Sequence, residues 1–241
     1  MARRRFFVDR VHNGHAQISG EPAHHLTRVL RVEPGQKFEL SDNHRVYLAE
    51  VESARKDLVG FTIVEEIEAA PPAVGVTLLA SLIRFERFEW MIEKATELGV
   101  EAVIPVETER ASSGLEQAAP KRVERWNRIA REASEQSRRD RLPSISAPQS
   151  FEDALATSAD YRYVLEEAGA PAILERLPGA KRTEDNVALL VGPEGGWTDR
   201  ERAAIAQAGW IPVSLGRQIL RAETAAIAGL AILTAAWTQS R

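Results

Sequence analysis

The residues best suited to chemistry in this chain lie in two short loops of its C-terminal third. The first loop, residues 192–197, reads Gly-Pro-Glu-Gly-Gly-Trp and follows the apolar run Val-Ala-Leu-Leu-Val at 187–191. Its three glycines let the backbone approach a ligand closely and present bare N–H groups to it. The loop lacks the lysine and the spacing of a phosphate-binding P-loop, and Glu194 would repel a polyphosphate. A ligand with hydroxyl or amine groups fits better, although a tight turn that merely requires glycine explains the same residues.

The second loop, residues 215–225, reads Leu-Gly-Arg-Gln-Ile-Leu-Arg-Ala-Glu-Thr-Ala and leads into the last predicted helix. Glu223 and Thr224 stand where a carboxylate complements the helix dipole and a hydroxyl can cap the helix, which is the purely structural interpretation. Arg221 stands between Leu220, which we expect to be buried, and a helix start, where a guanidinium usually has an assigned partner. Because ligands of open α/β sheets bind outside the carboxyl ends of the strands, two such loops after successive strands predict a binding site.

Basic side chains are concentrated in two segments, although the whole chain carries a net charge of −4. Residues 121–141 contain eight basic and four acidic residues, a local charge of +4, and three consecutive arginines occupy positions 3–5. Phosphate recognition needs only a local patch, because salt screens charges beyond roughly 8–10 Å. The two segments therefore indicate a nucleic-acid partner, while a solvated helix face is the alternative interpretation of each.

These residues must be positioned by two different kinds of structure. Before residue 70, the runs at 38–41 and 46–51 alternate apolar and polar residues as half-buried strands do, and 61–64 is a further β-rich run. A short helix beginning at Glu21-Pro22 interrupts them, and the whole predicts a small β-barrel. Ala-Ala-Pro-Pro at 69–72 predicts a linker, because paired prolines resist both helix and central strand.

After the linker, strands and helices alternate along the chain. The apolar run at 76–80 is typical of a strand buried on both faces, and further strands are predicted at 102–106, 161–165, 187–191 and 211–215. Helices are predicted around 90–98, from Pro120, after the capping residues Ser150 and Thr198, and at 223–237. This alternation predicts an α/β layer fold with a mostly parallel sheet.

Composition narrows the class of protein further. The 241 residues include no cysteine, which excludes a disulfide scaffold, a thiolate metal site and a cysteine nucleophile, and we predict no metal site. No run of about 18 apolar residues exists, which excludes a transmembrane helix. The first ten residues are basic and lack the apolar segment of a secretory signal, so we expect a cytoplasmic protein.

Together, the two loops resemble those of a known family. Gly-Pro-Glu-Gly-Gly at 192–196 and Leu-Gly-x-x-Ile-Leu-Arg-x-Glu-Thr-Ala at 215–225 are similar to the RsmE family of SPOUT methyltransferases. Lys-Ala-Thr-Glu-Leu-Gly at 94–99 and Glu-Ala-Ser-Glu-Gln-Ser at 132–137 resemble two helices of its catalytic domain. Arg-Phe-Phe-Val at 5–8 and His-His-Leu-x-x-Val-Leu-Arg at 24–31 resemble its PUA-like barrel. The chain departs from the family pattern at 84–86, at 111–112 and at Arg138, which concerns RNA contacts rather than the cofactor loops.

The resemblance implies a fold, a reaction and partners. Residues 1–70 would form a PUA-like RNA-binding β-barrel, and residues 74–241 a SPOUT α/β domain with a C-terminal trefoil knot at about 187–230. The enzyme would transfer a methyl group from S-adenosylmethionine, leaving S-adenosylhomocysteine, to N3 of a uridine in the decoding region of 16S ribosomal RNA in the assembled 30S subunit. It would be a homodimer through the apolar helix at 225–237, for which an internal core helix is the alternative interpretation.

The resemblance also implies roles for individual residues. The cofactor-binding residues would be Leu165, Leu190, Gly192, Glu194, Gly195, Gly196, Leu215, Gly216, Ile219, Leu220 and Thr224. The RNA-binding residues would be Arg4, Arg5, Arg28, Arg31, Arg138, Arg139 and Arg141. From the chemistry of such a uracil, we expect Arg221 to stabilise the negative charge that develops as N3 loses its proton, and Glu223 to orient Arg221 or accept that proton. The alternative interpretation is a contact of Arg221 with Glu223 or with the backbone that only holds the loop.

Two other functions stay open at this point. A ribose 2′-O-methyltransferase of the same superfamily would share the cofactor loops and act on a hydroxyl group. A non-catalytic RNA-binding protein of ribosome assembly would keep the barrel and the basic segments. Cofactor binding separates this last function from the two enzymes, and nucleoside analysis after methylation separates base from ribose.

Overall fold

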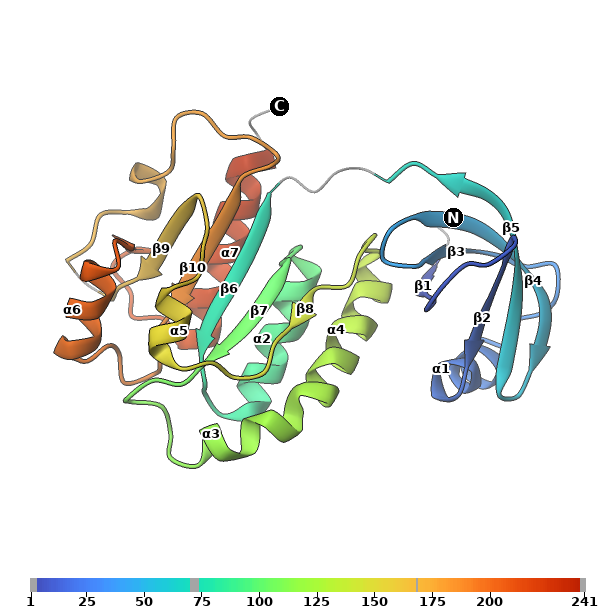
Figure 1. Ribbon diagram of the computed structural model, residues 1–241, viewed down its shortest axis with the longest axis horizontal. Helices are drawn as coiled ribbons and strands as arrows, with labels where there is room; N and C mark the ends of the chain where they lie inside the picture. The colour runs from blue at the N-terminus through green and yellow to red at the C-terminus, as the bar shows by residue number, and fades with distance from the viewer. Residues whose placement is uncertain (1–3, 70–73, 168, 239–241) are drawn as a thin grey trace. The chain divides into compact units, whose positions relative to one another are not determined.

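The computed structural model describes residues 4–69, 74–167 and 169–238, which form two compact units (Figure 1). One unit contains the described residues up to 69 together with Ser134–Leu142, and the other contains the remaining described residues. The linker expected at 69–72 lies, apart from Ala69, outside the described residues. The assignment of Ser134–Leu142 to the first unit has no counterpart in the sequence pattern, which places this segment in the second.

The first unit is a curled five-stranded sheet with a short helix. Its strands follow the order β1-β3-β4-β5-β2, and only β1 and β3 are parallel. Their bounds are β1 (Arg5–Phe7), β2 (His15–Ser19), β3 (Lys37–Ser41), β4 (Val46–Arg55) and β5 (Leu58–Ile67). In the described residues the edge strands β1 and β2 do not pair with each other, so the sheet is a half-barrel rather than a closed barrel.

A helical segment contributes to the core of this half-barrel. The helix α1 (Glu21–His24) continues as the π-helical segment η1 (His25–Val29). Ala23 and Leu26 from these turns are buried in the same cluster as Ile18, Leu40 and Phe61 of the strands. The short helix predicted from Glu21-Pro22 is therefore confirmed, and it contributes buried apolar side chains to this core.

The second unit is a six-stranded parallel sheet between two layers of helices. The strand order is β11-β9-β10-β6-β7-β8, with every pair parallel. The strands are β6 (Gly75–Ser81), β7 (Ala102–Val106), β8 (Ser144–Ile145), β9 (Tyr161–Leu165), β10 (Asn186–Val191) and β11 (Ile211–Val213). The helical segments are α2 (Phe85–Glu97), α3 (Leu115–Ala118), η2 (Ala119–Arg122), α4 (Val123–Ser137), α5 (Phe151–Leu155), η3 (Ile173–Glu175), α6 (Asp199–Gln207) and α7 (Ala222–Thr238). The predicted α/β layer fold is confirmed.

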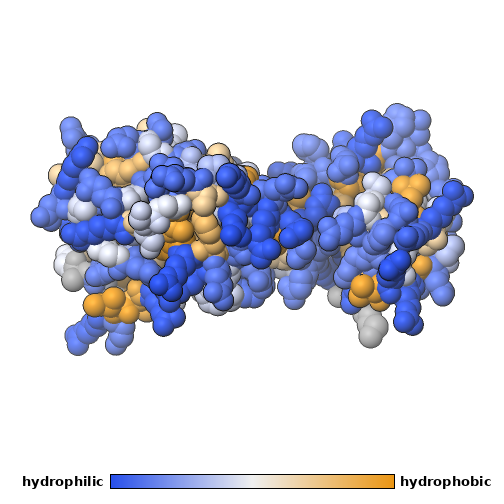
Figure 2. Space-filling model, turned by 90° about the horizontal axis from the view of Figure 1, so that it is seen from below, coloured by the Kyte–Doolittle hydropathy of each residue, from blue (hydrophilic) through white to orange (hydrophobic). Residues whose placement is uncertain are grey.

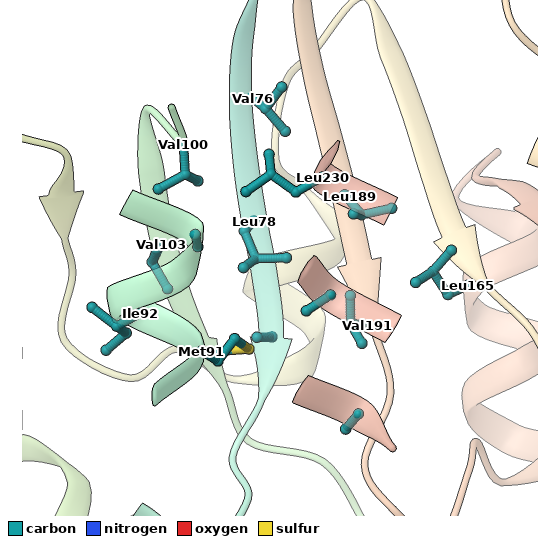
Figure 3. Close-up of a cluster of buried hydrophobic side chains, with 14 of the residues drawn as sticks. Val76, Leu78, Met91, Ile92, Val100, Val103, Leu165, Leu189, Val191 and Leu230 are labelled. Carbon is teal, nitrogen blue, oxygen red and sulfur yellow. The ribbon is translucent and has the colours of Figure 1, made fainter. Parts of the chain in front are cut away.

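Both faces of this sheet are covered, which explains why its strands are apolar throughout. On one face, Met91 of α2 and Leu230 of α7 are buried against alternate residues of β6 and β10 (Figure 3). Trp126 of α4 belongs to the same cluster. On the other face, α5 and α6 pack against Leu79 and Leu190. The predicted caps hold two of these helices in place: Ser150 accepts from the backbone N–H of Asp153, and Thr198 forms a complete capping box with Glu201.

Because the strands are parallel, the loops that follow β9, β10 and β11 emerge at the same edge of the sheet. These three strands are neighbours in the sheet, so the topology places the two candidate loops and residues 166–167 side by side. No helix in the described residues is long and apolar enough to cross a membrane. The face drawn in Figure 2 is mostly hydrophilic, with small and separate apolar areas.

Candidate functional site

A cavity of about 280 Å³ lies at the carboxyl ends of β9, β10 and β11. Its walls are the end of β9 with residues 166–167, the glycine loop at 192–197, and the arginine loop, which we define as residues 214–221. The first residues of α7 complete it on one side, and Arg87 of α2 lines it as well. The sheet topology therefore brings both sequence-predicted loops into one site.

The glycine loop is shaped so that its glycines are required. Gly196 has φ of 65°, in the left-handed region that favours glycine, and its N–H donates to the Pro193 carbonyl at 2.9 Å. A Cβ atom at Gly192 would lie 2.9 Å from the ring of Trp197, too close for a side chain. The indole N–H of Trp197 donates to the Leu165 carbonyl at 3.1 Å and so ties the loop to β9. The structure is therefore compatible with both interpretations of these glycines, as residues that a tight turn requires and as residues that let the backbone approach a ligand.

An arginine from a distant segment also holds the glycine loop. Arg110 donates through Nη1 to the carbonyl oxygen of Gly195 at 2.9 Å and to that of Trp197 at 3.3 Å. These two bonds turn the carbonyl oxygens toward Arg110 and fix the backbone of the loop. A preformed backbone surface of this kind lowers the ordering cost when a ligand binds.

The arginine loop presents a guanidinium that is not paired with an acid. Arg221 is exposed, lines the cavity, and forms no ion pair within the described part of the chain. Its carbonyl oxygen accepts from the Ala225 N–H at 2.8 Å, which starts α7. Ser214 shapes the beginning of the loop, because its hydroxyl donates to the Gly216 carbonyl at 3.0 Å. The guanidinium of Arg221 is thereby left available to a ligand or substrate.

Charges of both signs line the cavity in nearly equal number. Glu166 pairs with Arg202, with 3.4 Å between Oε1 and Nε, and Glu194 pairs closely with Arg87. Glu167 is exposed and, like Arg221, forms no ion pair among the described residues. A ligand that carries both a cationic and an anionic group would therefore find one unpaired partner for each.

Most of the predicted cofactor residues line this cavity. They are Leu165, Gly192, Glu194, Gly196, Leu215, Gly216, Ile219 and Leu220. The other three lie nearby: Leu190 is fully buried in the core, Gly195 contacts Arg110, and Thr224 is exposed in the first turn of α7.

Glu223 forms no ion pair with Arg221 in the described residues, although it is two residues away in sequence. Its side chain is 6% exposed, does not line the cavity, and faces Arg87, with 3.8 Å between Arg87 Nε and Glu223 Oε1. Its second oxygen, Oε2, is buried and has no hydrogen-bond partner in the described residues. The expected pairing of Glu223 with Arg221 is not what the structure shows.

The predicted RNA-binding arginines fall into two groups. Arg5 is 8% exposed and donates to Glu39, and Arg138 pairs with the same carboxylate at 2.8 Å, so both have partners inside the first unit. Arg4, Arg28, Arg31 and Arg141 are exposed, and Arg139 donates to the Arg141 carbonyl at 3.1 Å. The charges of Arg4, Arg28, Arg31 and Arg141 are therefore exposed to solvent, where they could meet phosphate groups.

Sequence reasoning missed several residues of the site. Glu166 and Glu167 lie in the loop after Leu165, which the family resemblance implies as a third cofactor loop, but neither side chain was singled out. Arg87 and Arg110 belong to segments far away in sequence, and no local pattern marks them as neighbours of the glycine loop. In the described residues, no group of three or more histidine or acidic side chains could hold a metal ion.

The fold and the site define a class of protein that family models describe. A model of the RNA methyltransferase domain matches residues 70–234, and a model of the RNA methyltransferase PUA domain matches residues 18–64. The curled sheet and the parallel sheet thus each correspond to one domain of a single class, the RNA methyltransferases.

Individual relatives are more specific. Ribosomal RNA small subunit methyltransferase E of Bacillus subtilis is 30% identical over 230 residues, which is 90% of this chain and 88% of the relative. The crystal structure of the protein of that name from Neisseria gonorrhoeae, bound to S-adenosyl methionine, has a TM-score of 0.87 at 28% identity and covers 98% of both chains. A Legionella pneumophila structure described as a methyltransferase with bound SAM has a TM-score of 0.88, also at 28% identity and 98% coverage of both chains. The chain belongs to the ribosomal RNA small subunit methyltransferase E family.

Proposed function

We propose that this chain methylates N3 of a uridine in the decoding region of 16S ribosomal RNA, on the assembled 30S subunit. Family membership makes it an S-adenosylmethionine-dependent ribosomal RNA methyltransferase, and the proposal adds the base atom and its place in the RNA. The observation that carries it is the cavity itself, in which both motif loops meet and Arg221 is exposed without an ion-pair partner in the described residues.

The cavity fits S-adenosylmethionine. The glycine loop offers backbone groups for the adenine, and apolar side chains of Leu165, Leu215 and Leu220 surround them. Glu167 complements the ammonium of the amino-acid end, while Glu166 and Glu194 are neutralised by arginines. When bound, this cofactor supplies an electrophilic methyl group on a positively charged sulfur.

The uracil must become a nucleophile at a nitrogen that carries a proton. N3 lies between two carbonyl groups, so loss of its proton spreads negative charge onto their oxygens. Arg221 can donate two parallel hydrogen bonds to one of these oxygens, since its planar guanidinium has a fork of donors. Hydrogen bonds from a positioned cation are worth more where water is excluded, so this contact favours the deprotonated base at the moment of transfer.

The variant Arg221→Lys tests this role. It keeps the charge but loses the planar fork, so methyl transfer should fall about a hundredfold, or about 2.7 kcal/mol. The affinity for S-adenosylmethionine and the melting temperature should stay near those of the parent, because Arg221 has no ion pair in the described residues. Arg217→Lys is the matched control, since Arg217 is exposed in the same loop and does not line the cavity. Near-normal turnover of Arg221→Lys would contradict the proposal, and loss of cofactor binding would assign Arg221 to the cofactor instead.

The site of methylation needs its own measurement. Small subunits that lack the modification are incubated with the enzyme and labelled cofactor, and the nucleosides are then separated by mass spectrometry. The proposal expects 3-methyluridine. A 2′-O-methylated ribose would identify the other enzymatic function, and the absence of both cofactor binding and methylated product would favour an assembly protein.

We also propose the larger arrangement that the family resemblance implies. A PUA-like domain at 1–70 precedes a SPOUT domain at 74–241 with a trefoil knot at about 187–230, and two chains form a homodimer in the cytoplasm. The last helix supports a dimer, because Leu230 and Leu233 of α7 face the core whereas Ile227 and Ile232 stay only half-buried. Light scattering at several protein concentrations tests the oligomeric state, and a monomer throughout would contradict it.

A further inference from the structure

One wall of the cavity is supplied by neither predicted loop, and its charged residue is Arg87. This arginine lies in the first turn of α2, which begins at Phe85, and its side chain is 33% exposed. Arg87 lines the cavity together with residues of the glycine loop and the arginine loop. It is therefore a cation from a third element that reaches the place where the two loops meet.

Arg87 contacts one carboxylate from each side of the cavity. Its Nη1 donates to Oε1 of Glu194 in the glycine loop, a close ion pair between residues 107 positions apart. Its Nε lies 3.8 Å from Oε1 of Glu223, in the first turn of α7 directly after the arginine loop. One guanidinium thus connects α2 with the glycine loop and with the first turn of α7.

The two carboxylates depend on this arginine to different degrees. Glu194 is 40% exposed, so water also solvates it, whereas the side chain of Glu223 is 6% exposed. Arg87 is the cation that faces Glu223 in the described residues, and the other carboxylate oxygen has no hydrogen-bond partner there. A buried carboxylate is strongly disfavoured without a counter-charge, so Glu223 fixes the position of Arg87 and Arg87 in turn fixes Glu194.

The glycine loop needs such a fixed point. Gly192, Gly195 and Gly196 give its backbone more conformational freedom than other residues would. Arg110 holds the loop only through carbonyl oxygens, and Trp197 holds it at its far end. Arg87 instead holds the tip of the loop, through the side chain of Glu194.

We propose that Arg87 is a positioning residue for the methyl donor, which holds the glycine loop at a fixed distance from the start of α7 through Glu194 and Glu223. The inference rests on the proposed function, because the cavity must bind S-adenosylmethionine for this distance to matter. Without Arg87 the loop samples other positions, and the cofactor must order it on binding, which weakens affinity. Once the cofactor is bound, the walls are in place and the chemical step proceeds.

The test measures cofactor affinity and kinetics on the full-length protein with the variants Arg87→Gln and Arg87→Lys. For Arg87→Gln, the Kd for S-adenosylmethionine by calorimetry and its KM should rise at least about tenfold. At saturating cofactor, kcat should stay within about threefold of the parent. Arg87→Lys should fall between, because one ammonium cannot match a fork that faces two carboxylates. Arg200→Gln is the matched control, as it removes an exposed arginine–glutamate pair with Glu109 outside this cavity.

A merely structural role of Arg87 would lower the melting temperature and the active fraction, and so kcat, while Kd and KM stay unchanged. That result would overturn the inference.

Glu194→Gln provides a second route if Arg87→Gln does not fold, because Glu194 is partly exposed. It should also weaken binding at least about tenfold by itself, and unchanged affinity would overturn the inference. Where Arg87→Gln does fold, the double variant should bind no more weakly than Arg87→Gln alone. Additive losses would show that the two residues act separately and would overturn the inference. If the parent protein itself did not bind S-adenosylmethionine, the proposed function would fail; binding by the parent that Arg87→Gln leaves unchanged would refute this inference alone.

Discussion

Arg4 and Arg5 are adjacent arginines of the first unit. They test which basic side chains stabilise the fold and which are left to bind RNA. Arg4 is exposed, whereas Arg5 is 8% exposed and lies at the start of β1. Arg5 donates to Oε2 of Glu39 from Nε at 3.2 Å and from Nη2 at 2.9 Å, and from Nη1 to the Arg138 carbonyl at 2.8 Å. We predict that Arg5→Gln destabilises the first unit and that Arg4→Gln does not.

The expected magnitude follows from what Arg5→Gln leaves behind. Breaking a buried ion pair costs about 3–5 kcal/mol, because the remaining charge is left without compensation. Glu39 keeps Arg138 at 2.8 Å, and Asp140, the other acid that pairs with Arg5, is partly exposed, so the loss should lie near the lower end, about 3 kcal/mol. For a unit of about 60–100 residues, each kcal/mol shifts the melting temperature by about 4–8 °C, so a fall of at least about 12 °C is expected. Arg4→Gln should change stability by less than about 0.5 kcal/mol.

The assay combines thermal unfolding with RNA binding at several salt concentrations. Arg4→Gln should flatten the dependence of log K on log salt, by about 0.7–0.9 for each phosphate that the protein no longer neutralises. Arg5→Gln should melt early and, at temperatures where it is folded, keep the parent slope. If Arg5→Gln melted with the parent and flattened the slope instead, Arg5 would bind RNA directly, and the reasoning from the buried pair would be refuted.

Two further predictions concern the second unit. Gly195→Val places a Cβ 3.2 Å from Cβ of Arg110. Cofactor affinity measured by calorimetry should therefore fall more than about tenfold, roughly 1.4 kcal/mol, while the fold persists. Unchanged affinity with a lower melting temperature would favour the turn-only interpretation. The pKa of Asp185 is lowered from 3.8, mainly by the backbone N–H of Arg182 and also by the indole of Trp237. The stability that this carboxylate contributes is therefore present above its usual pKa and is lost as the pH falls through the lowered value. In urea unfolding, the free energy of unfolding should fall less on acidification in Asp185→Asn than in the parent.

The sequence predicted the fold of the second unit well because its signals are local. Apolar runs marked the central strands β6, β7 and β10, and the caps Ser150 and Thr198 marked helix starts that the structure confirms. Less of the fold of the first unit could be predicted from the sequence. The strand β1 has three residues, all buried, so it shows no alternation, and its parallel pairing with β3 depends on contacts that local periodicity does not encode.

The site was predictable where topology alone decides it. Parallel strands place their following loops at one edge, so the glycine loop and the arginine loop could be expected to meet, and both line the cavity. What could not be predicted is which charges pair. Proximity in sequence suggested Arg221 for Glu223, whereas in the structure Glu223 faces Arg87, on a helix more than a hundred positions earlier.

The same limit applies to the basic segment at 121–141, whose local charge of +4 includes only its own acids. Within the second unit, Arg122 and Arg125 share Glu89 of α2, at 3.6 and 2.8 Å, and within the first unit Arg138 pairs with Glu39 of β3. Both acids come from other elements, and each is nearly buried at its side chain, with 13% and 11% exposed. Charge that is already paired releases few counterions on binding RNA, so the salt dependence should indicate fewer neutralised phosphates than the number of basic residues implies. A basic run in sequence sets an upper limit on the charge a protein offers to RNA, and the acids that the fold brings against it decide how much of that charge remains.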